Sequence, residues 1–336
     1  MRIKKTKCIL CNEKSVKDFI NLGKTALANN LINSPKLRIK KYPLIVGKCS
    51  NCEHIQLSHL PNPILMFKNY LYLSSASSTL TNHLKNIPMA VNNLSKIKKK
   101  DLVIDIGSND GTLLSGYDKF APTKVGVEPA KNLAKYYKNK KNNLINDFFN
   151  FKIAKKIKKK FGLAKVITAT NVFPHLQKLN EFGKSVNSLL DKNGILLIEA
   201  HYLGNLIKDT AFDTIYHEHC SYWSVSSVKK FCDLNNLELF KVDKLPIHHG
   251  QIRCWIRLKG SKKIHKSVTN LINLEKKNKL HSDHNLLKFK NKIFTLQKKI
   301  NELFLNIKNK KLTIAGYGAP AKATTFTSFF KINKSK

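Results

Sequence analysis

The stretch that decides the fold is Leu102–Leu114, which reads LVIDIGSNDGTLL. A run of apolar, β-forming residues leads directly into a turn that contains Gly107 and Gly111, and a helix is expected to begin at that turn. A strand, a glycine turn and a helix in this order form the first unit of a doubly wound α/β sheet. The two glycines predict that the backbone of the turn closely approaches a ligand.

The next expected strand indicates the chemistry of that ligand. The strand VGV is followed by Glu128, at the position where doubly wound folds hold the hydroxyl pair of a ribose. The turn lacks the G-x-G-x-x-G order that seats a pyrophosphate, and its two carboxylates would repel phosphate. S-adenosylmethionine contains a ribose, an ammonium and a sulfonium but no phosphate, so these residues favour it over NAD. The predicted cofactor contacts here are Asp105, Gly107, Ser108, Asn109, Asp110, Gly111, Glu128 and Pro129.

Two more strands are predicted at the spacing of an α/β fold. The stretch KVITATN ends at Asn171, and GILLIEA ends at Glu199 and Ala200. Polar groups at the carboxyl ends of parallel strands meet at one edge of the sheet. We therefore expect Asn171, as a further cofactor contact, and His175 beside the glycine turn. A loop histidine that only bonds its neighbours is the alternative for His175.

The densest group of proton-carrying side chains lies in Asp213–Trp223, which reads DTIYHEHCSYW. His217, Glu218 and His219 stand here between two tyrosines. The stretch is either a catalytic centre or a half-buried strand or loop whose polar groups bond one another. His217 and His219 would share a face of an extended segment, which also allows a metal pair, but no third ligand is evident.

Four of the seven cysteines form two pairs with the spacing of a zinc site. The pairs are Cys8-x-x-Cys11 and Cys49-x-x-Cys52, near the start of the chain. Each pair can hold one face of a tetrahedral ion, and four thiolates leave no coordination position open, so a structural zinc is predicted. A lobe of this size needs such a staple. An odd number of cysteines without an export signal argues against a disulfide framework.

The length, composition and net charge of the chain limit the class of protein. With 336 residues, 42% of them hydrophobic, the chain is long enough for two or three domains with their own cores. It has no apolar run of about 18 residues and no signal peptide, so a cytoplasmic protein without membrane segments is expected. The formal charge of +40 would suit a polyanion. However, only four of the 61 basic residues are arginine, the residue best suited to reading nucleic acid. The lysines are interpreted as solvated surface, and nucleic acid is not an expected partner.

Taken in order, the two cysteine pairs, DIGSNDG, NVFPH and YHEH resemble the S-adenosylmethionine-dependent sugar C-methyltransferases. The resemblance runs from Cys8 to about Phe330. It implies an α/β protein with a small N-terminal zinc-binding lobe (1–80), a Rossmann-like methyltransferase sheet (81–260), and a helical connector with the start of a second, incomplete Rossmann-like domain (261–336). Members of this family act on nucleotide-linked keto-deoxysugars, so the implied partner is a sugar nucleotide, with dTDP as the expected nucleotide. We expect the protein to be a monomer.

The resemblance also implies a catalytic group. The family's base matches His219, and the rest of its catalytic group matches Glu218, Tyr216, His175 and Tyr72. Tyr70 is the alternative to Tyr72 if the alignment slips by two residues in the linker that follows the zinc lobe.

Two departures from the family pattern are visible. The family's HGGSLR turn is His248–Arg253 here, HHGQIR, so one glycine is replaced by histidine. The C-terminal domain begins with LTIAGYGAPAKATTF, which predicts one strand, a glycine turn and the start of a helix before the sequence ends at Lys336. Because one such unit cannot bury both faces of a sheet, we expect either a truncated version of the family or a fragment.

Methylation of carbon requires removal of a proton next to a ketone and stabilisation of the enolate oxygen. We expect His219 to take the proton and Glu218 to orient it or raise its basicity. Tyr216, Tyr72 or His175 would donate to the enolate oxygen. The alternatives are an O- or N-methyltransferase with the same cofactor site, an inactive relative, or a zinc-bearing protein that binds nucleic acid.

Overall fold

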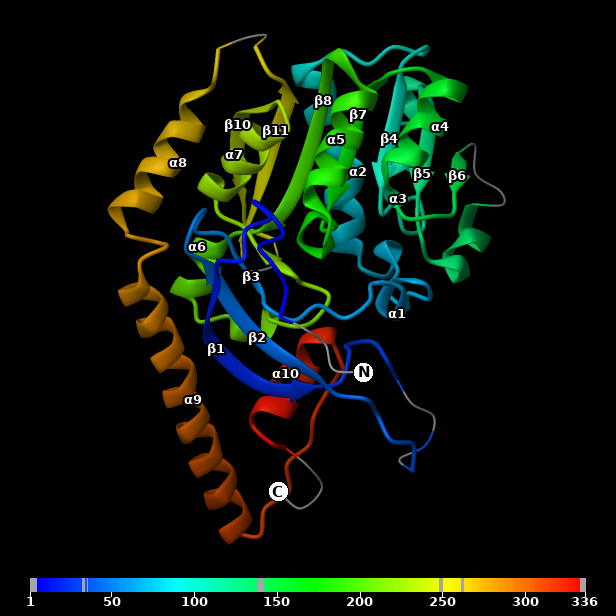
Figure 1. Ribbon diagram of the computed structural model, residues 1–336. Coiled ribbons are helices and arrows are strands. Elements are labelled where there is room, and N and C mark those ends of the chain that lie inside the picture. Colours follow the sequence, from blue (N-terminus) through cyan, green and yellow to red (C-terminus); the bar gives the residue numbers. More distant parts are fainter. Residues whose placement is uncertain are drawn as a thin grey trace.

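The described part of the chain comprises residues 5–332 without 32–33, 35, 138–141, 248–249 and 261–262, in a computed structural model. Its largest element is a sheet of seven strands in the order β10-β11-β8-β7-β4-β5-β6 (Figure 1). These strands are β4 (Leu102–Ile106), β5 (Thr123–Val127), β6 (Asn143–Ile145), β7 (Ala164–Thr170), β8 (Leu190–His201), β10 (Leu237–Leu245) and β11 (Gln251–Leu258). The four strands expected between Leu102 and Ala200 belong to this sheet, and the α/β fold class is confirmed.

The order and the directions of the strands determine where a ligand can bind. β4 pairs in parallel with β5 on one side and β7 on the other, and β11 is the strand that runs antiparallel to its neighbours β8 and β10. The chain thus moves outward from β4 in both directions. Ligands of open α/β sheets bind at such a switch point, beyond the carboxyl ends of the strands.

Helices cover both faces of this sheet because successive strand residues point to opposite faces. Ile104 and Ile198 pack into a core with one group of helices, whereas Val103 and Leu197 pack into a second core with another group. The first group is α4 (Phe151–Phe161), α5 (Leu179–Leu189) and α7 (Val225–Leu234), and the second is α2 (Ser78–Leu94) and α3 (Thr112–Ser115). In Figure 1, α4 and α5 lie in front of the sheet and α2 behind it.

A smaller antiparallel sheet joins the N-terminal lobe to the methyltransferase-like part of the chain. Its order is β1-β2-β3-β9, with β1 (Val16–Thr25), β2 (Tyr42–Cys49), β3 (Ile55–Leu57) and β9 (Ser221–Tyr222). β9 belongs to the stretch Asp213–Trp223, and its Tyr222 and Ser221 pair with Ile55 and Gln56. The lobe is therefore continuous with the stretch that carries the candidate base.

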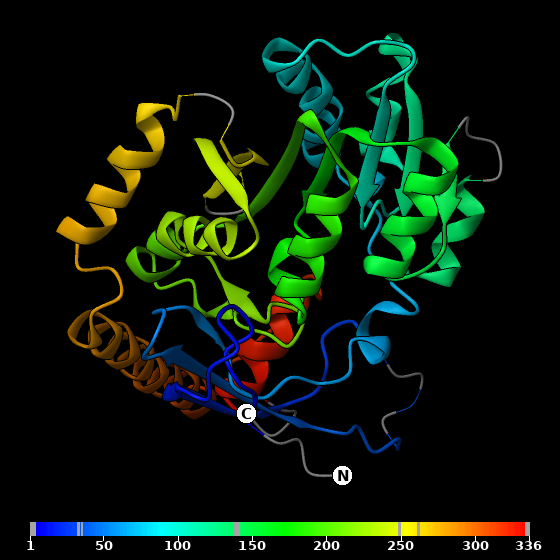
Figure 2. The same cartoon turned by 45° about the horizontal axis from the view of Figure 1, so that its top comes forward.

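The C-terminal part does not contain the expected strand. Residues 312–320 form neither helix nor strand, and Leu312 and Ile314 are 61% and 45% exposed. A strand gains little unless neighbouring strands pair with it, and the described chain provides this segment with none. The expected helix does form, as α10 (Ala321–Phe329), and it packs beside β1 (Figures 1 and 2).

The remaining elements are short connectors and the two consecutive helices that precede α10, which follow one another along one side of the molecule (Figure 1). They are α1 (Ile64–Phe67), α6 (Leu203–Lys208), α8 (Lys266–Lys277), α9 (Asp283–Asn309) and the 3₁₀ turns η1 (Ser74–Ala76), η2 (Asp118–Phe120), η3 (Lys131–Tyr137), η4 (Phe173–His175) and η5 (Phe212–Thr214). Among the described residues, no helix is both long and apolar enough to span a membrane.

A buried ion cluster locks the antiparallel edge of the large sheet to α2. The Glu199 carboxylate is fully buried, and it accepts hydrogen bonds from Arg253 Nε at 2.6 Å and from His83 Nε2 at 2.8 Å. Removing one partner of a buried ion pair leaves an uncompensated charge.

We predict that Glu199→Ala lowers the free energy of unfolding by about 3 kcal/mol or more, because Arg253 remains buried without its carboxylate. Urea denaturation measures this change. The control is Asp233→Asn, which breaks the exposed Lys229–Asp233 pair and should cost less than about 1 kcal/mol. Equal losses for both variants would contradict the structural role of the cluster.

Candidate active site

One large cavity lies beyond the carboxyl ends of β4, β5 and β7. Its volume is about 1330 Å³. Its wall combines the turn after β4, the linker that contains Tyr70 and Tyr72, the candidate base His219, and the start of α10 at Pro320. Four segments that are distant in sequence therefore enclose a single space.

The glycine turn after β4 has the backbone that its sequence predicts. Gly107, Asn109 and Gly111 have φ angles of +67°, +50° and +77°, in the left-handed region that favours glycine and asparagine. A Cβ atom on Gly107 would lie 2.3 Å from the Val172 side chain. A side chain is therefore excluded at Gly107 both by the backbone angle and by the approach of the loop after β7.

Glu128 holds this turn in place. Its two carboxylate oxygens accept hydrogen bonds from the backbone N–H groups of Asn109 and Ala130, both at 2.9 Å. Asp105, on the neighbouring strand, accepts a hydrogen bond of 2.6 Å from the Thr168 hydroxyl. Both carboxylates lie in the cavity wall.

The electrostatics of this wall fit a cationic ligand. Burial raises the pKa of Asp105 to about 7, against the hydrogen bond from Thr168, and burial also raises the pKa of Glu128. A cation in the cavity would stabilise the ionised form of both groups, whereas a phosphate would oppose it. S-adenosylmethionine carries a sulfonium and an ammonium and no phosphate, so the residues present fit that cofactor.

The predicted cofactor residues fall into two sets. Asp105, Gly107, Ser108, Asn109, Glu128, Pro129 and Asn171 are in the cavity wall. Asp110 and Gly111 are not in that wall. The Asp110 carboxylate instead accepts hydrogen bonds from Thr112 and from the backbone N–H of Ser75, so it shapes the turn and the linker.

Two aromatic residues on the cofactor side of the cavity were not predicted from the sequence. Phe148 and Phe149 line the cavity just after β6. Two adjacent aromatic residues in a short loop were the available signal, but β6 has three residues and was not predicted as a strand. Gln251 was also missed. Its side-chain N–H donates to Asn171 Oδ1 at 2.5 Å, which leaves the Asn171 amide nitrogen as a donor.

The ring of His219 is fixed at both nitrogens. Nδ1 lies 2.8 Å from the carbonyl oxygen of Thr214, and Nε2 lies 2.9 Å from the Tyr216 hydroxyl. A carbonyl only accepts, so Nδ1 carries the proton and donates it to this bond. In the neutral ring, Nε2 therefore has a lone pair, which accepts the hydrogen bond from the Tyr216 hydroxyl.

This geometry assigns a different partner to Glu218 from the one expected. The group that orients the His219 ring at Nδ1 is the Thr214 carbonyl, whereas we expected Glu218 in that role. The Glu218 oxygens accept hydrogen bonds from Asn29 Nδ2 at 2.8 Å and from the Tyr70 hydroxyl at 3.2 Å. Burial raises the pKa of Glu218 to about 7, and these two bonds oppose that rise.

The structure separates the two tyrosines that the sequence left as alternatives. Tyr70 is directed to Glu218, and burial raises its pKa well above the usual value. Tyr72 is 43% exposed at the cavity edge, where its backbone carbonyl accepts a hydrogen bond from Asn109. We call His219, Tyr216 and Glu218 the proton-handling group. The geometry favours Tyr70 as the further tyrosine that belongs to it.

Two further histidines surround His219. The ring of His175 stacks on it with 5.3 Å between centroids, and the ring of His201 lies at 5.0 Å. Both line the cavity. Burial, with a smaller contribution from the charge of His201, lowers the pKa of His175 to about 3, so His175 is neutral at physiological pH. His201 was missed because it is the last residue of β8 and has no motif around it.

The alternative of a His217–His219 metal pair finds no support. The Nε2 atom of His217 donates to the carbonyl of Pro43 in the N-terminal lobe, at 3.1 Å. Within the described residues, the one group of three or more His, Cys, Asp or Glu side chains close enough to hold an ion is the cysteine cluster.

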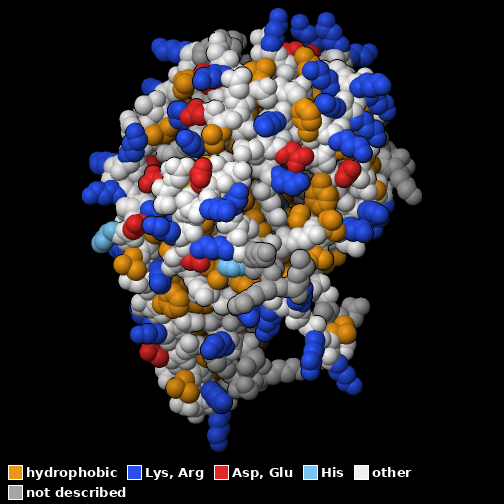
Figure 3. All heavy atoms as spheres, viewed as in Figure 1, with side chains coloured by type: hydrophobic (Ala, Val, Ile, Leu, Met, Phe, Trp, Pro, Cys, Tyr) orange, Lys and Arg blue, Asp and Glu red, His pale blue; other side chains and the backbone are white. Residues whose placement is uncertain are grey.

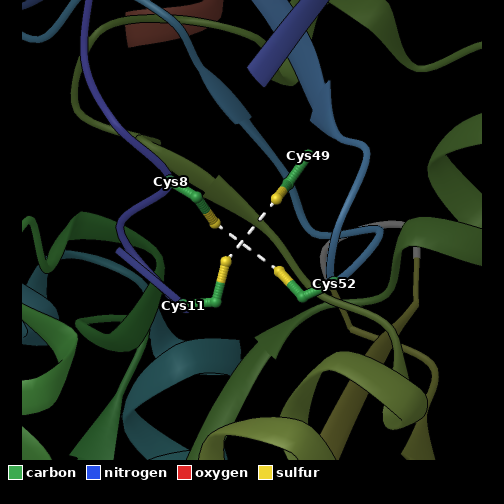
Figure 4. Close-up of side chains that lie close together, drawn as sticks. All are labelled: Cys8, Cys11, Cys49 and Cys52. Carbon is green, nitrogen blue, oxygen red and sulfur yellow. Dashed lines mark hydrogen bonds between the residues drawn. The ribbon is translucent and has the colours of Figure 1, made fainter. Parts of the chain in front are cut away.

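That cluster unites the two cysteine pairs (Figure 4). The Sγ atoms of Cys8, Cys11, Cys49 and Cys52 all lie within 4.8 Å of one another. The closest sulfur pairs, Cys8–Cys52 and Cys11–Cys49, are 3.6 Å apart. Four thiolates around a tetrahedral zinc with bonds of about 2.3 Å would stand roughly 3.8 Å apart, so the cluster fits zinc without rearrangement. A hydrogen bond of 2.9 Å between Ser15 Oγ and Cys49 Sγ supports the site from outside.

Three family models match consecutive parts of the chain. Residues 8–67 match a zinc binding domain, residues 81–242 a methyltransferase domain, and residues 246–336 a C-methyltransferase C-terminal domain. The chain is an S-adenosylmethionine-dependent methyltransferase. It has a zinc-binding lobe, and its last part matches the C-terminal domain of C-methyltransferases.

Individual proteins are similar to this chain over different lengths. The methyltransferase is 27% identical over 321 residues to the C-methyltransferase NovU of Streptomyces niveus, an alignment that covers 94% of this chain and 76% of that protein. Among solved structures, a protein from Pyrococcus horikoshii aligns with 59% of this chain and 96% of its own, at 13% identity and a TM-score of 0.45. An S-adenosylmethionine-dependent methyltransferase from Clostridium acetobutylicum aligns with 54% of this chain and 92% of its own, at 13% identity and a TM-score of 0.42.

Because the chain is a methyltransferase, the alternative of a zinc-bearing protein that is not an enzyme is wrong. In Figure 3 the Lys and Arg side chains are spread over the whole visible face and do not gather in one patch.

We predict that the purified methyltransferase contains about one zinc per chain and that Cys11→Ser loses most of it, because three thiolates hold the ion far less tightly than four. Metal analysis and thermal unfolding measure the loss and the expected drop in stability. The control is Cys254→Ala, which changes a buried cysteine outside the cluster and should retain the zinc. Equal zinc contents in Cys11→Ser and the wild type would contradict the four-cysteine site.

Proposed function

We propose that the enzyme methylates a carbon next to the ketone of a nucleotide-linked keto-deoxysugar, with His219 as the base. The observation that carries this proposal is the orientation of His219. With Nδ1 donating to the Thr214 carbonyl, Nε2 is the acceptor nitrogen of the ring, and His219 lines the same cavity as Asp105 and Glu128. A base in this position can accept a proton from a substrate carbon.

The residues of the cavity divide the work of C-methylation. S-adenosylmethionine, held by Asp105, Glu128 and the glycine turn, supplies an electrophilic methyl group. When substrate displaces the Tyr216 hydroxyl from Nε2, His219 takes the proton from the carbon, and the electron pair of the broken C–H bond is shared with the ketone oxygen. That electron pair then forms the bond to the methyl group, and the sulfonium becomes a neutral thioether.

Hydroxyl and amide donors can stabilise the oxygen on which charge develops. Burial raises the pKa of Tyr216 above its usual value, so its hydroxyl keeps its proton and can donate. The Asn171 amide nitrogen, directed by Gln251, is a second donor at the same strand edge. Preformed donors of this kind typically contribute a hundredfold or more to the rate. His175 is neutral and stacks on the base, so it adds no charge that would oppose proton uptake.

The cavity supports a substrate larger than a simple sugar. Pockets for one small ligand commonly measure about 300–1,000 Å³, and this cavity of about 1330 Å³ has room for a second ligand beside the cofactor. Beyond the histidines its wall includes Lys322 and the first residues of α10, whose cationic and N–H groups suit phosphates. NovU is named as a C-methyltransferase as well.

We predict that His219→Asn lowers both methyl transfer and solvent deuterium uptake at the substrate carbon at least a hundredfold, because asparagine cannot take the proton. A dTDP-4-keto-6-deoxysugar is the probe, with mass spectrometry for deuterium and methyl incorporation. The control is His284→Asn on the exposed surface of α9. Normal exchange and turnover in His219→Asn would remove the base from this role. Methyl transfer without exchange would indicate an O- or N-methyltransferase.

A second prediction concerns pH. Ionised Glu218 holds Tyr70 and favours a positive charge on the neighbouring imidazole, so activity should fall as the pH decreases through about 7. Tyr70→Phe removes a donor that stabilises the carboxylate. This raises the pKa of Glu218, so the acid limb of kcat should move up by as much as about one pH unit. Tyr72→Phe should leave the limb where it is. A shift in Tyr72→Phe instead would show that Tyr72 is the tyrosine coupled to this group.

A further inference from the structure

We propose that Asn132 is a positioning residue. It holds Tyr70 in place relative to the cofactor wall, which consists of the glycine turn and Glu128, and so keeps the Tyr70 hydroxyl bonded to Glu218. This inference rests on the proposed function, and it goes beyond it by assigning a role to a side chain outside the catalytic motifs.

Asn132 binds the backbone of Tyr70 with both ends of its amide. Its Oδ1 accepts the Tyr70 N–H at 2.9 Å, and its Nδ2 donates to the Tyr70 carbonyl at 2.8 Å. One side chain therefore satisfies both backbone groups of a residue that is 62 positions away in the sequence. The adjacent backbone N–H of Lys131 donates to the carbonyl of Lys68 at 3.0 Å, which extends the contact along the linker.

The side chain of Tyr70 contacts the Phe67 ring and Glu218, but its backbone lies in a linker without regular structure. The linker runs between α1, which ends at Phe67, and η1, which begins at Ser74, without helix or strand in between. Leu71, the residue after Tyr70, is 58% exposed. Contacts from Asn109 hold the later part of the linker, at the Tyr72 carbonyl and the Ser74 N–H. At Tyr70 itself, the two bonds from Asn132 fix the backbone.

Asn132 is in turn anchored to the cofactor wall. It lies in η3, which begins three positions after Glu128. The backbone N–H of Ala130, just before η3, donates to the Glu128 carboxylate. Tyr137, at the end of η3, is buried, and its hydroxyl donates to Ser108 Oγ at 2.6 Å. The turn that carries Asn132 is thus fixed to the glycine turn at both ends.

At the other end of this path, the Tyr70 hydroxyl reaches Glu218 Oε2. Hydrogen bonds run from Glu128 through the backbone of η3 and the Asn132 amide to Tyr70 and Glu218. The cofactor wall and the proton-handling group are thereby parts of one network, and a displaced Tyr70 would leave Glu218 with one donor fewer.

The groups that face Glu218 determine how a loss of this network appears in a pH profile. Tyr70 faces it from the linker, Asn29 from the N-terminal lobe, and Tyr216 from its own stretch, where Asp213 also acts on Tyr216. Tyr70 is the one of these that Asn132 holds. Loss of the two hydrogen bonds from Asn132 should therefore change the pKa of Glu218 in the same direction as loss of the Tyr70 hydroxyl.

The experiment is a double-mutant cycle of Asn132→Ala and Tyr70→Phe, with kcat, both KM values and the acid limb as readouts. Alone, Asn132→Ala should lower kcat about tenfold or more and move the acid limb in the same direction as Tyr70→Phe. In the Tyr70→Phe background it should change kcat less than about twofold and leave the limb unmoved. Asn132→Asp, which keeps the acceptor but has no donor for the Tyr70 carbonyl, should behave like Asn132→Ala and serves if the alanine variant is unstable.

The matched control is Asn187→Ala. The Asn187 amide also makes two hydrogen bonds to the backbone of a distant segment, here to the carbonyls of Asn235 and Asn236, both at 3.2 Å. Its loss should cost similar stability without moving the acid limb. Asn132→Ala would overturn the inference if it matched the wild type in kcat and limb, or if its full effect remained in the Tyr70→Phe background. If Tyr70→Phe had no effect on C-methylation, the proposed role of Tyr70 would fail, and the inference with it.

Discussion

The constraint on which the rest of the structure depends is the convergence of four sulfur atoms from two distant cysteine pairs. Cys49 ends β2 and Cys52 lies three residues before the start of β3, so an ion held by the cluster fixes the hairpin between these strands. β3 in turn pairs with β9, three residues after Glu218. A structural metal far from the chemistry thus determines where the candidate base stands relative to the sheet, and the lobe becomes one wall of the active site.

The opposite wall depends on two buried carboxylates. Asp105 and Glu128 are costly to bury in ionised form, as their raised pKa values indicate. A core would normally avoid such groups. Their presence at the switch point of the sheet, on backbone turned by glycines, makes sense if a cationic ligand shares the cavity. The cost in the empty enzyme is then offset when the cofactor binds.

The sequence allows prediction wherever local pattern and chemistry coincide. The strands before Gly107 and Glu128, the zinc pairs and the candidate base His219 all belong to short sequence motifs. The partners of those groups could not be predicted in the same way. The Thr214 carbonyl is a backbone atom that any residue would supply, while Asn29, Asn132 and Gln251 reach their targets only through tertiary packing. The segment LTIAGYG shows the opposite failure, because a local strand pattern specifies a strand only where another strand is available to pair with it.

The pairing of β3 with β9 also has a consequence for the order of folding. The zinc pairs leave the ribosome early, whereas Tyr222 follows much later, on the order of ten seconds or more at a synthesis rate of about 5–20 residues per second. During that interval β3 is an edge strand with unpaired backbone groups, which is the kind of edge that recruits other chains. The nascent lobe therefore passes through a period of vulnerability to aggregation, and early capture of zinc by its cysteines would help it to stay folded until its last strand arrives.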